Sequence, residues 1–164
     1  MIGWQEQLKE MLTAAPRTAI LGVGSELCGD DAAGMVLIER LRMQLAEDAD
    51  CLLLAGSTAP ENFTGMIRHF KPDLLLLVDA AHVGGEVGTM RCCDPAEIDG
   101  MGCSTHMLPL HVMLDYLSSE TGCAVLVVGI QPGEMEFATS PCPEMLAAID
   151  QLATMIVDIR TRRL

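Results

Sequence analysis

The sequence predicts a doubly wound α/β fold in three layers, α/β/α, with a mostly parallel sheet of about five strands and one antiparallel edge strand. Short apolar runs alternate with segments whose apolar residues recur every three to four positions, as in amphipathic helices. The apolar runs lack polar alternation, which is typical of strands covered on both faces. No repeat or linker divides the 164 residues, so we expect a single domain over residues 1–164.

Five apolar runs are predicted to form the strands. The first, 18–23, leads into glycines that permit a sharp turn. The run 74–78 is the most apolar of the five, and it ends abruptly at Asp79. The run 86–93 follows a glycine pair and is the expected antiparallel edge. The other two runs are 51–55 and 124–130.

Five helices are expected around these strands. An N-terminal helix is predicted by Trp4, Leu8, Met11 and Leu12, and it ends before Pro16. The other four helices are marked by apolar residues at helical spacing, which are Leu37, Leu41 and Leu45; Phe63, Met66, Ile67 and Phe70; Leu110, Met113, Leu114 and Leu117; and Leu146, Ile149, Ala153 and Ile156. Strands alternating with helices in this order favour right-handed crossovers and a parallel sheet.

Composition and charge limit the classes of partner. The formal net charge of −13 at pH 7 argues against nucleic acid, because Lys and Arg drive that binding. No apolar run approaches the roughly 18 residues of a membrane helix, and the N-terminus does not resemble a secretory signal. The seven Cys are never spaced as CxxC, so neither a disulfide framework nor a structural zinc site is indicated. We therefore expect a cytoplasmic protein with no nucleic-acid or membrane partner.

Carboxylates lie where two predicted strands end. Asp30 and Asp31 lie near the N-terminus of the helix that follows the first strand, where acidic residues are favoured as caps. We interpret Asp30 as a capping residue and leave the role of Asp31 open between capping and function. Asp79 directly follows the third strand, at the edge where open α/β sheets bind ligands. If the two strands are parallel and adjacent, Asp31 and Asp79 share one crevice; otherwise Asp79 only terminates a turn.

His106 is the third candidate residue. It follows a loop containing glycine and serine and precedes a predicted helix, so its imidazole can be directed over the edge of the sheet. Together with Asp31 and Asp79 it would form a metal site, since imidazole suits nickel, zinc and copper and carboxylates add charge. Three protein ligands would leave positions open to water or substrate. A surface or capping role is the alternative for His106, and His82 is a weaker alternative ligand.

Five motifs occur in the order found in hydrogenase maturation proteases: GVGSELCGDDAAG at 22–34, GSTAPEN at 56–62, LLLLVDA at 74–80, STHMLPL at 104–110 and GIQP at 129–132. The chain therefore resembles this family. The APEN and GIQP motifs most resemble the branch that processes the large subunit of the formate-hydrogenlyase type of nickel-iron hydrogenase. Ser25 and Ala32 stand where the family usually has Asn and Gly, and both departures concern the geometry of the turn.

The resemblance implies an endopeptidase that removes the C-terminal extension of a hydrogenase large-subunit precursor after nickel insertion. It implies that Asp31, Asp79 and His106 contact this nickel, which belongs to the substrate, and that no organic cofactor is needed. We expect either Asp31 or Asp79 to act as the catalytic base. A monomer is sufficient to recognise one precursor tail.

Three alternatives remain at the level of sequence. Cys103, close to His106 in sequence, would be the nucleophile of a cysteine protease. A non-enzymatic metal chaperone or adaptor in hydrogenase assembly would share the fold and the ligands. Gly22 and Gly24 loosely match a dinucleotide-binding turn, although position 27 is Leu and acidic residues at the helix opening would repel a pyrophosphate.

Overall fold

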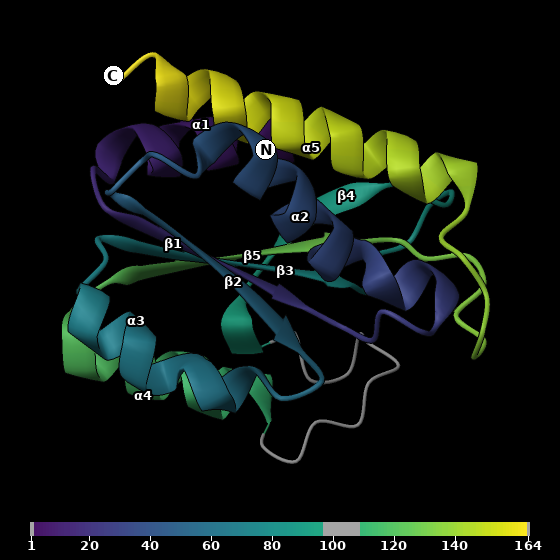
Figure 1. Cartoon of the computed structure of the whole chain (residues 1–164), viewed down its shortest axis with the longest axis horizontal. Helices are drawn as coiled ribbons and strands as arrows, with labels where there is room; N and C mark the ends of the chain where they lie inside the picture. The colour runs from purple at the N-terminus through teal and green to yellow at the C-terminus, as the bar shows by residue number, and fades with distance from the viewer. Residues whose placement is uncertain (1, 97–108, 164) are drawn as a thin grey trace.

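The computed structural model of the chain describes residues 2–96 and 109–163 and has the predicted three-layer α/β/α architecture (Figure 1). Its sheet has the order β2-β1-β3-β5-β4. Strands β1, β2, β3 and β5 are parallel, and β4 pairs antiparallel with β5 at the edge. The strand bounds are β1 Thr18–Val23, β2 Cys51–Ser57, β3 Leu74–Ala80, β4 Met90–Cys93 and β5 Ala124–Ile130.

Helices cover both faces of the sheet (Figure 1). One face carries α1 (Trp4–Ala14), α2 (Ala33–Leu45) and α5 (Pro143–Thr161), and the other carries α3 (Thr64–Phe70) and α4 (Leu110–Thr121). Two short 3₁₀ helices, η1 (Gly29–Ala32) and η2 (Pro60–Phe63), precede α2 and α3. None of the helices in the described ranges combines the length and the hydropathy needed to cross a bilayer.

The central strands are apolar because both of their faces are buried. Every residue of β1 and β3 is buried, and successive side chains alternate between the two hydrophobic layers. Ile20 packs in the layer under α1, α2 and α5, whereas Leu21 packs in the layer under α3 and α4. Burial of one such side chain stabilises the fold by about 1.5–3 kcal/mol.

Two details of the sequence prediction are wrong. The fourth strand begins at Met90 and not at position 86, because Gly84, Gly85 and Gly88 have φ values of 85°, 84° and 92° and turn the chain. In α5, Met145 is buried whereas Leu146 is only partly buried, so the buried face begins one residue earlier than expected.

A buried ion pair closes the amino-terminal edge of the sheet. Arg160 of α5 is 2% exposed, and its Nε and Nη2 donate to Oδ2 of Asp48 at 3.0 and 2.9 Å. Its Nη1 also donates to the Pro16 carbonyl at 2.9 Å. These contacts hold the end of α5 against the segments that lead into β1 and β2, and every charge in the cluster has a partner.

Candidate active site

The order of the strands reverses direction between β1 and β3. The chain passes from β1 to β2 on one side, and β5 and β4 lie on the other side of β3. At such a point the connections leave in opposite directions and open a crevice at the carboxyl ends of the strands. Asp31 follows β1 in η1, and Asp79 is the sixth residue of β3. The predicted adjacency of the two parallel strands is confirmed, and η1 contacts β3.

Close backbone packing places Asp31 in this crevice. At Gly34 a Cβ atom would lie 2.5 Å from the Val23 nitrogen and 2.6 Å from the Val78 carbonyl oxygen, so only glycine lets α2 approach β1 and β3 this closely. Gly24 has a φ of 131°, and a Cβ there would lie 1.9 Å from the Asp31 carbonyl oxygen. The chain therefore turns sharply after β1 and brings Asp31 back over the strand.

Asp31 has one oxygen in use and one without a partner. The residue is 6% exposed, and its Oδ2 accepts a hydrogen bond from the Ser25 backbone N–H at 2.9 Å. Its Oδ1 is buried and has no hydrogen-bond partner among the residues that the structure describes. Because a backbone N–H makes this bond, Ser in place of the family's Asn at position 25 does not remove it.

Asp79 resembles Asp31 in its burial and in its hydrogen bonding. It is 3% exposed, and its buried Oδ1 has no hydrogen-bond partner within residues 2–96 and 109–163. Burial, followed by the charge of Asp31, raises the pKa of the Asp79 carboxyl well above its ordinary value, and a hydrogen bond from the Ala80 backbone opposes this. The effect of Asp31 on this pKa means that the two carboxylates act on one another electrostatically.

Two buried carboxylates with unpartnered oxygens favour a cation between them. Buried polar groups are nearly always paired, and an unpaired buried charge is costly. A divalent cation would satisfy both orphaned oxygens and relieve the repulsion between the acids. Within residues 2–96 and 109–163 no group of three His, Cys, Asp or Glu converges to hold a metal. The Asp31–Asp79 pair would thus leave most coordination positions to other ligands.

Two of the predicted site residues cannot be compared with the structure. His106 and Cys103 lie in 97–108, outside the described residues. The alternative ligand His82 is exposed, and its Nδ1 lies 3.4 Å from Nε2 of Gln131. No group of three potential ligands that includes His82 exists among the described residues. The structure therefore brings together Asp31 and Asp79 and leaves the role of His106 as a prediction.

Six cysteines lie in the described residues, and raised pKa values make three of them poor nucleophiles. The six are Cys28, Cys51, Cys92, Cys93, Cys123 and Cys142, and three of them, Cys51, Cys93 and Cys123, are buried. Burial raises the pKa of Cys51 and of Cys92 to about 11 in each case, so both remain protonated at neutral pH. Cys142 also has a raised pKa, from burial and from its hydrogen bond to Asp30.

The interpretation of Asp30 as a cap of its own helix is wrong. Its side chain makes no cap hydrogen bond to η1 or α2. Instead Oδ2 accepts from the Gly133 N–H at 2.6 Å, and Oδ1 accepts from the Cys142 N–H at 2.7 Å. Asp30 thus holds the segment between β5 and α5 against η1 through Gly133 and Cys142.

Gln131, the third residue of the GIQP motif, is a positioning residue. Its Oε1 accepts hydrogen bonds from the Val83 N–H at 2.9 Å and the Gly84 N–H at 3.0 Å. These bonds hold the loop that follows β3, directly after Asp79 and Ala80. A polar residue after an apolar strand was the available signal, but its partners lie nearly fifty residues away.

A family model described as hydrogenase maturation protease matches residues 35–159 of the chain. The hydrogenase 3 maturation protease of Escherichia coli K12 is 35% identical over 136 residues, which cover 80% of this chain and 85% of that protein. A putative hydrogenase maturation protease of Methanocaldococcus jannaschii is 29% identical and covers 94% of this chain and 95% of that protein.

Solved structures agree with these sequence matches. A crystal structure of a [NiFe] hydrogenase maturation protease, HycI from Thermococcus kodakarensis, superposes with a TM-score of 0.86 at 35% identity, covering 94% of this chain and 99% of that one. A crystal structure of a hydrogenase 3 maturation protease superposes with a TM-score of 0.72 at 31% identity, covering 84% and 87% of the two chains. The fold is therefore shared with solved hydrogenase maturation proteases.

Proposed function

This chain belongs to the hydrogenase maturation proteases, and from that premise we propose that it removes the C-terminal extension of a nickel-iron hydrogenase large-subunit precursor after nickel has been inserted. The chain is an endopeptidase, since its relatives are named proteases and endopeptidases. The observation that carries the specific proposal is the buried pair Asp31 and Asp79, each with an Oδ1 that has no hydrogen-bond partner in the described part of the chain. Such a pair is suited to a cation that arrives with the substrate.

In this mechanism the nickel of the precursor is a recognition element. The unpartnered Oδ1 atoms of Asp31 and Asp79 contact it, and His106 completes the contact as predicted from sequence. Binding fixes the tail of the precursor against the crevice and places the scissile bond beside it, which contributes to catalysis through orientation. A precursor that lacks nickel leaves the two acids uncompensated and is not held in this way.

Proton transfer accompanies this recognition. The raised pKa of Asp79 means that the empty pair tends to hold a proton. The arriving cation stabilises the charged form of both carboxylates, so binding releases that proton. Hydrolysis then needs an activated water and a protonated leaving amine, and we assign the base to Asp31 or Asp79, since each retains carboxylate oxygens beside the crevice.

The test is proteolysis of purified precursor with and without nickel. The released C-terminal peptide is measured by mass spectrometry. We expect cleavage of the nickel-loaded precursor and none of the nickel-free form. Equal cleavage of both forms would contradict recognition of nickel, and cleavage of neither would favour the chaperone alternative.

Variants separate the metal-contact mechanism from the cysteine alternative. We expect His106→Ala to abolish cleavage, whereas Cys103→Ala cleaves normally. The opposite result, an inactive Cys103→Ala and a fully active His106→Ala, would exclude the proposed contact and favour a thiol nucleophile.

A further inference from the structure

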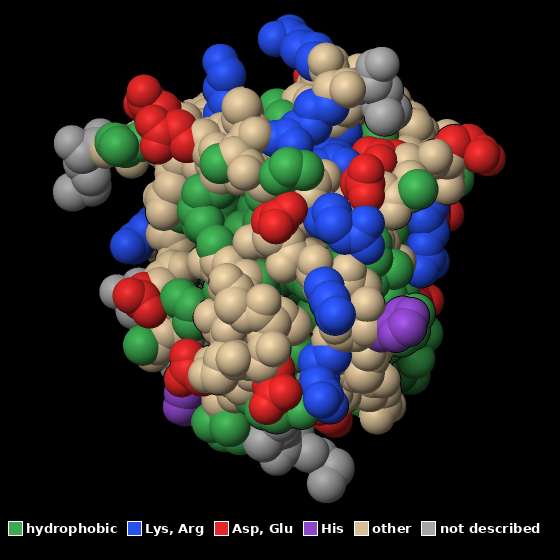
Figure 2. All heavy atoms as spheres, turned by 90° about the vertical axis from the view of Figure 1, so that its left-hand side faces the viewer, with side chains coloured by type: hydrophobic (Ala, Val, Ile, Leu, Met, Phe, Trp, Pro, Cys, Tyr) green, Lys and Arg blue, Asp and Glu red, His purple; other side chains and the backbone are tan. Residues whose placement is uncertain are grey.

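Charge is distributed unequally between the two edges of the sheet. The described loops at the carboxyl ends of the parallel strands are 24–32, 57–63, 81–89 and 131–142, and they contain acidic residues but no Lys or Arg. The opposite edge carries basic side chains, and Figure 2 shows Lys and Arg gathered, among acidic groups, on the face at the amino ends of the strands. Arg91 of β4 reaches this edge, where its Nη1 donates to the Val83 carbonyl at 3.1 Å, but the loops themselves carry only acidic charges. The part of the edge formed by these loops is therefore suited to a positively charged partner.

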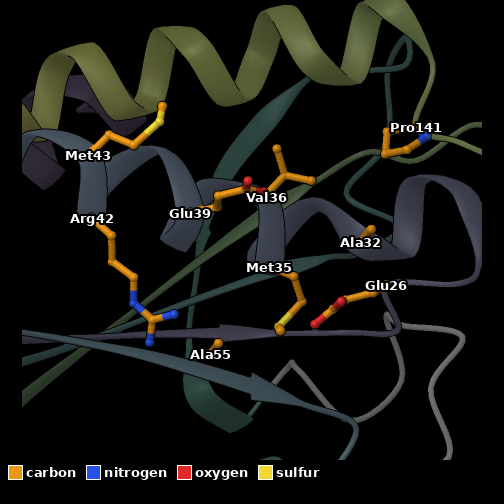
Figure 3. A pocket seen from close by; sticks show the side chains of 9 residues that line it. All are labelled: Glu26, Ala32, Met35, Val36, Glu39, Arg42, Met43, Ala55 and Pro141. Carbon is orange, nitrogen blue, oxygen red and sulfur yellow. The ribbon is translucent and has the colours of Figure 1, made fainter.

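A groove runs from this acidic edge along the outside of α2 (Figure 3). Its volume is about 640 Å³. One end lies at Ala32, which directly follows Asp31, and at Glu26, which directly follows Ser25, the residue bonded to Asp31. The remaining lining residues come from α2, β2 and the segment before α5, and they are Met35, Val36, Glu39, Arg42, Met43, Ala55 and Pro141.

The lining of the groove combines an apolar surface with unpaired carboxylates. Met35 and Val36 line its middle, and Figure 3 shows the Glu39 side chain lying toward Val36 while Arg42 points toward β2. Arg42 is engaged there, because its Nη2 donates to the Leu53 carbonyl at 3.3 Å. In the described part of the chain no hydrogen bond or ion pair engages the carboxylates of Glu26 and Glu39. This lining fits a long aliphatic side chain that ends in a cation.

The length of the groove limits what it can hold. At a rise of about 1.5 Å per helical residue, the distance from Ala32 to Met43 is about 16 Å. An extended chain covers this distance with about five residues. The groove is thus long enough for a short extended peptide and lies open to solvent, since Glu39 and Met43 are exposed.

We propose that this groove binds a segment of the precursor close in sequence to the scissile bond, and that this segment contributes a Lys or Arg side chain to Glu39. The aliphatic part of that side chain lies over Met35 and Val36, and its cationic end pairs with the carboxylate. The proposal rests on the proposed function, because the occupant is the same precursor. The nickel site would fix the reacting end of the tail, and the groove would fix its direction along α2.

The first experiment measures cleavage kinetics of nickel-loaded precursor. We expect Glu39→Gln to raise KM about tenfold with little change in kcat. The variant loses a charge-assisted hydrogen bond that holds the precursor equally before and during the reaction, so it weakens binding and not the chemical step. Glu47→Gln is the matched control, because Glu47 is also exposed but lies beyond the C-terminal end of α2. Equal KM values for the two variants would overturn the proposal while leaving the proposed function intact.

The second experiment does not depend on cleavage. A photo-crosslinking p-benzoylphenylalanine replaces Met43, which is 76% exposed in the groove, or Met66, which is 51% exposed on α3. We expect position 43 to cross-link several-fold more nickel-loaded precursor than position 66, at a segment containing Lys or Arg. Equal yields, or a cross-linked segment without a basic residue, would overturn the groove assignment even if no peptide is released.

Discussion

The two edges of the sheet each bury charged groups, but only one of them pairs its charges. At the amino edge, both Nε and Nη2 of Arg160 bond to Asp48, and Nη1 bonds to the Pro16 carbonyl. At the carboxyl edge, burial and the charge of Asp31 raise the pKa of Asp79, and each acid has a buried Oδ1 with no hydrogen-bond partner among the described residues. The first cluster is complete within the described residues, whereas the second has the arrangement that the proposed cation would complete.

This difference separates stability from function. A buried ion pair whose hydrogen bonds are satisfied connects α5 to the start of the sheet and requires nothing from outside. Burial and the charge of Asp31 raise the pKa of Asp79, so its ionisation is unfavourable in the folded protein, and natural proteins keep such groups where function requires them. The contrast predicts opposite effects when a charge is removed from each cluster.

The largest effect is expected at the incomplete cluster. Asp79→Asn keeps the size of the side chain but removes its charge, so we expect cleavage of nickel-loaded precursor to fall by about 10²- to 10⁴-fold. The same variant should unfold at the same or a higher temperature, because a buried repulsion is gone. Peptide release followed by mass spectrometry and thermal unfolding followed by circular dichroism measure the two effects.

A lower unfolding temperature in Asp79→Asn would show that the acid stabilises the fold. That result would contradict the proposed difference between the Asp31–Asp79 pair and the Arg160–Asp48 cluster. Asp31→Asn is the companion variant. It should lose activity to a similar extent, since both acids face the same cation.

The complete cluster should respond in the opposite sense. Arg160→Met leaves Asp48 buried and unpaired, and we expect a loss of about 3–5 kcal/mol in the free energy of unfolding. Arg162→Met is the control, because Arg162 is exposed at the same end of α5. The double variant Arg160→Met/Asp48→Asn should recover part of the loss. A single variant within about 1 kcal/mol of the original protein would contradict a structural role for the pair.

The pH dependence of stability should also distinguish the clusters. The pKa of Asp79 is higher in the folded than in the unfolded chain, so its contribution to stability is complete below the ordinary carboxyl value of 3.8 and declines as the pH rises above it. The unfolding temperature of Asp79→Asn minus that of the original protein should therefore increase with pH. A difference that is constant between about pH 4 and pH 8 would contradict the raised pKa.

The smallest effect is expected at the surface of the amino edge. Arg17 and Asp50 form an ion pair of 2.7 Å, but their side chains are 40% and 56% exposed. We expect Asp50→Asn to change the free energy of unfolding by less than about 1 kcal/mol, with the change decreasing as salt is added. Urea unfolding at low and high ionic strength measures this change in free energy. A loss as large as that of Arg160→Met would mean that burial does not determine how much an ion pair contributes to stability.

Much of the site follows from local sequence patterns. The apolar run 74–78 predicts a central strand, and the glycines around position 24 predict a turn, so Asp31 and Asp79 could be placed at strand ends. Their proximity needed only one further assumption, that β1 and β3 are parallel neighbours. That assumption is correct.

The remaining features depend on contacts between distant segments. Asp30 binds Cys142, 112 residues away, and nothing in the local pattern distinguishes it from a helix cap. Gln131 and Arg160 act on loops that are likewise distant in sequence. The groove along α2 is invisible in the sequence, because it is formed where α2, β2 and the segment before α5 meet. Local propensity predicts the elements, but not the partners that polar side chains find after folding.

The central claim is that Asp31 and Asp79 together contact a nickel ion. Its most direct test is a crystal structure of the protein with Ni²⁺, with anomalous diffraction measured at the nickel edge. We predict one strong peak within about 2 Å of Oδ1 of both carboxylates, a distance typical of first-row divalent cations. A nickel peak elsewhere, with both Oδ1 atoms still lacking a partner, would contradict the account.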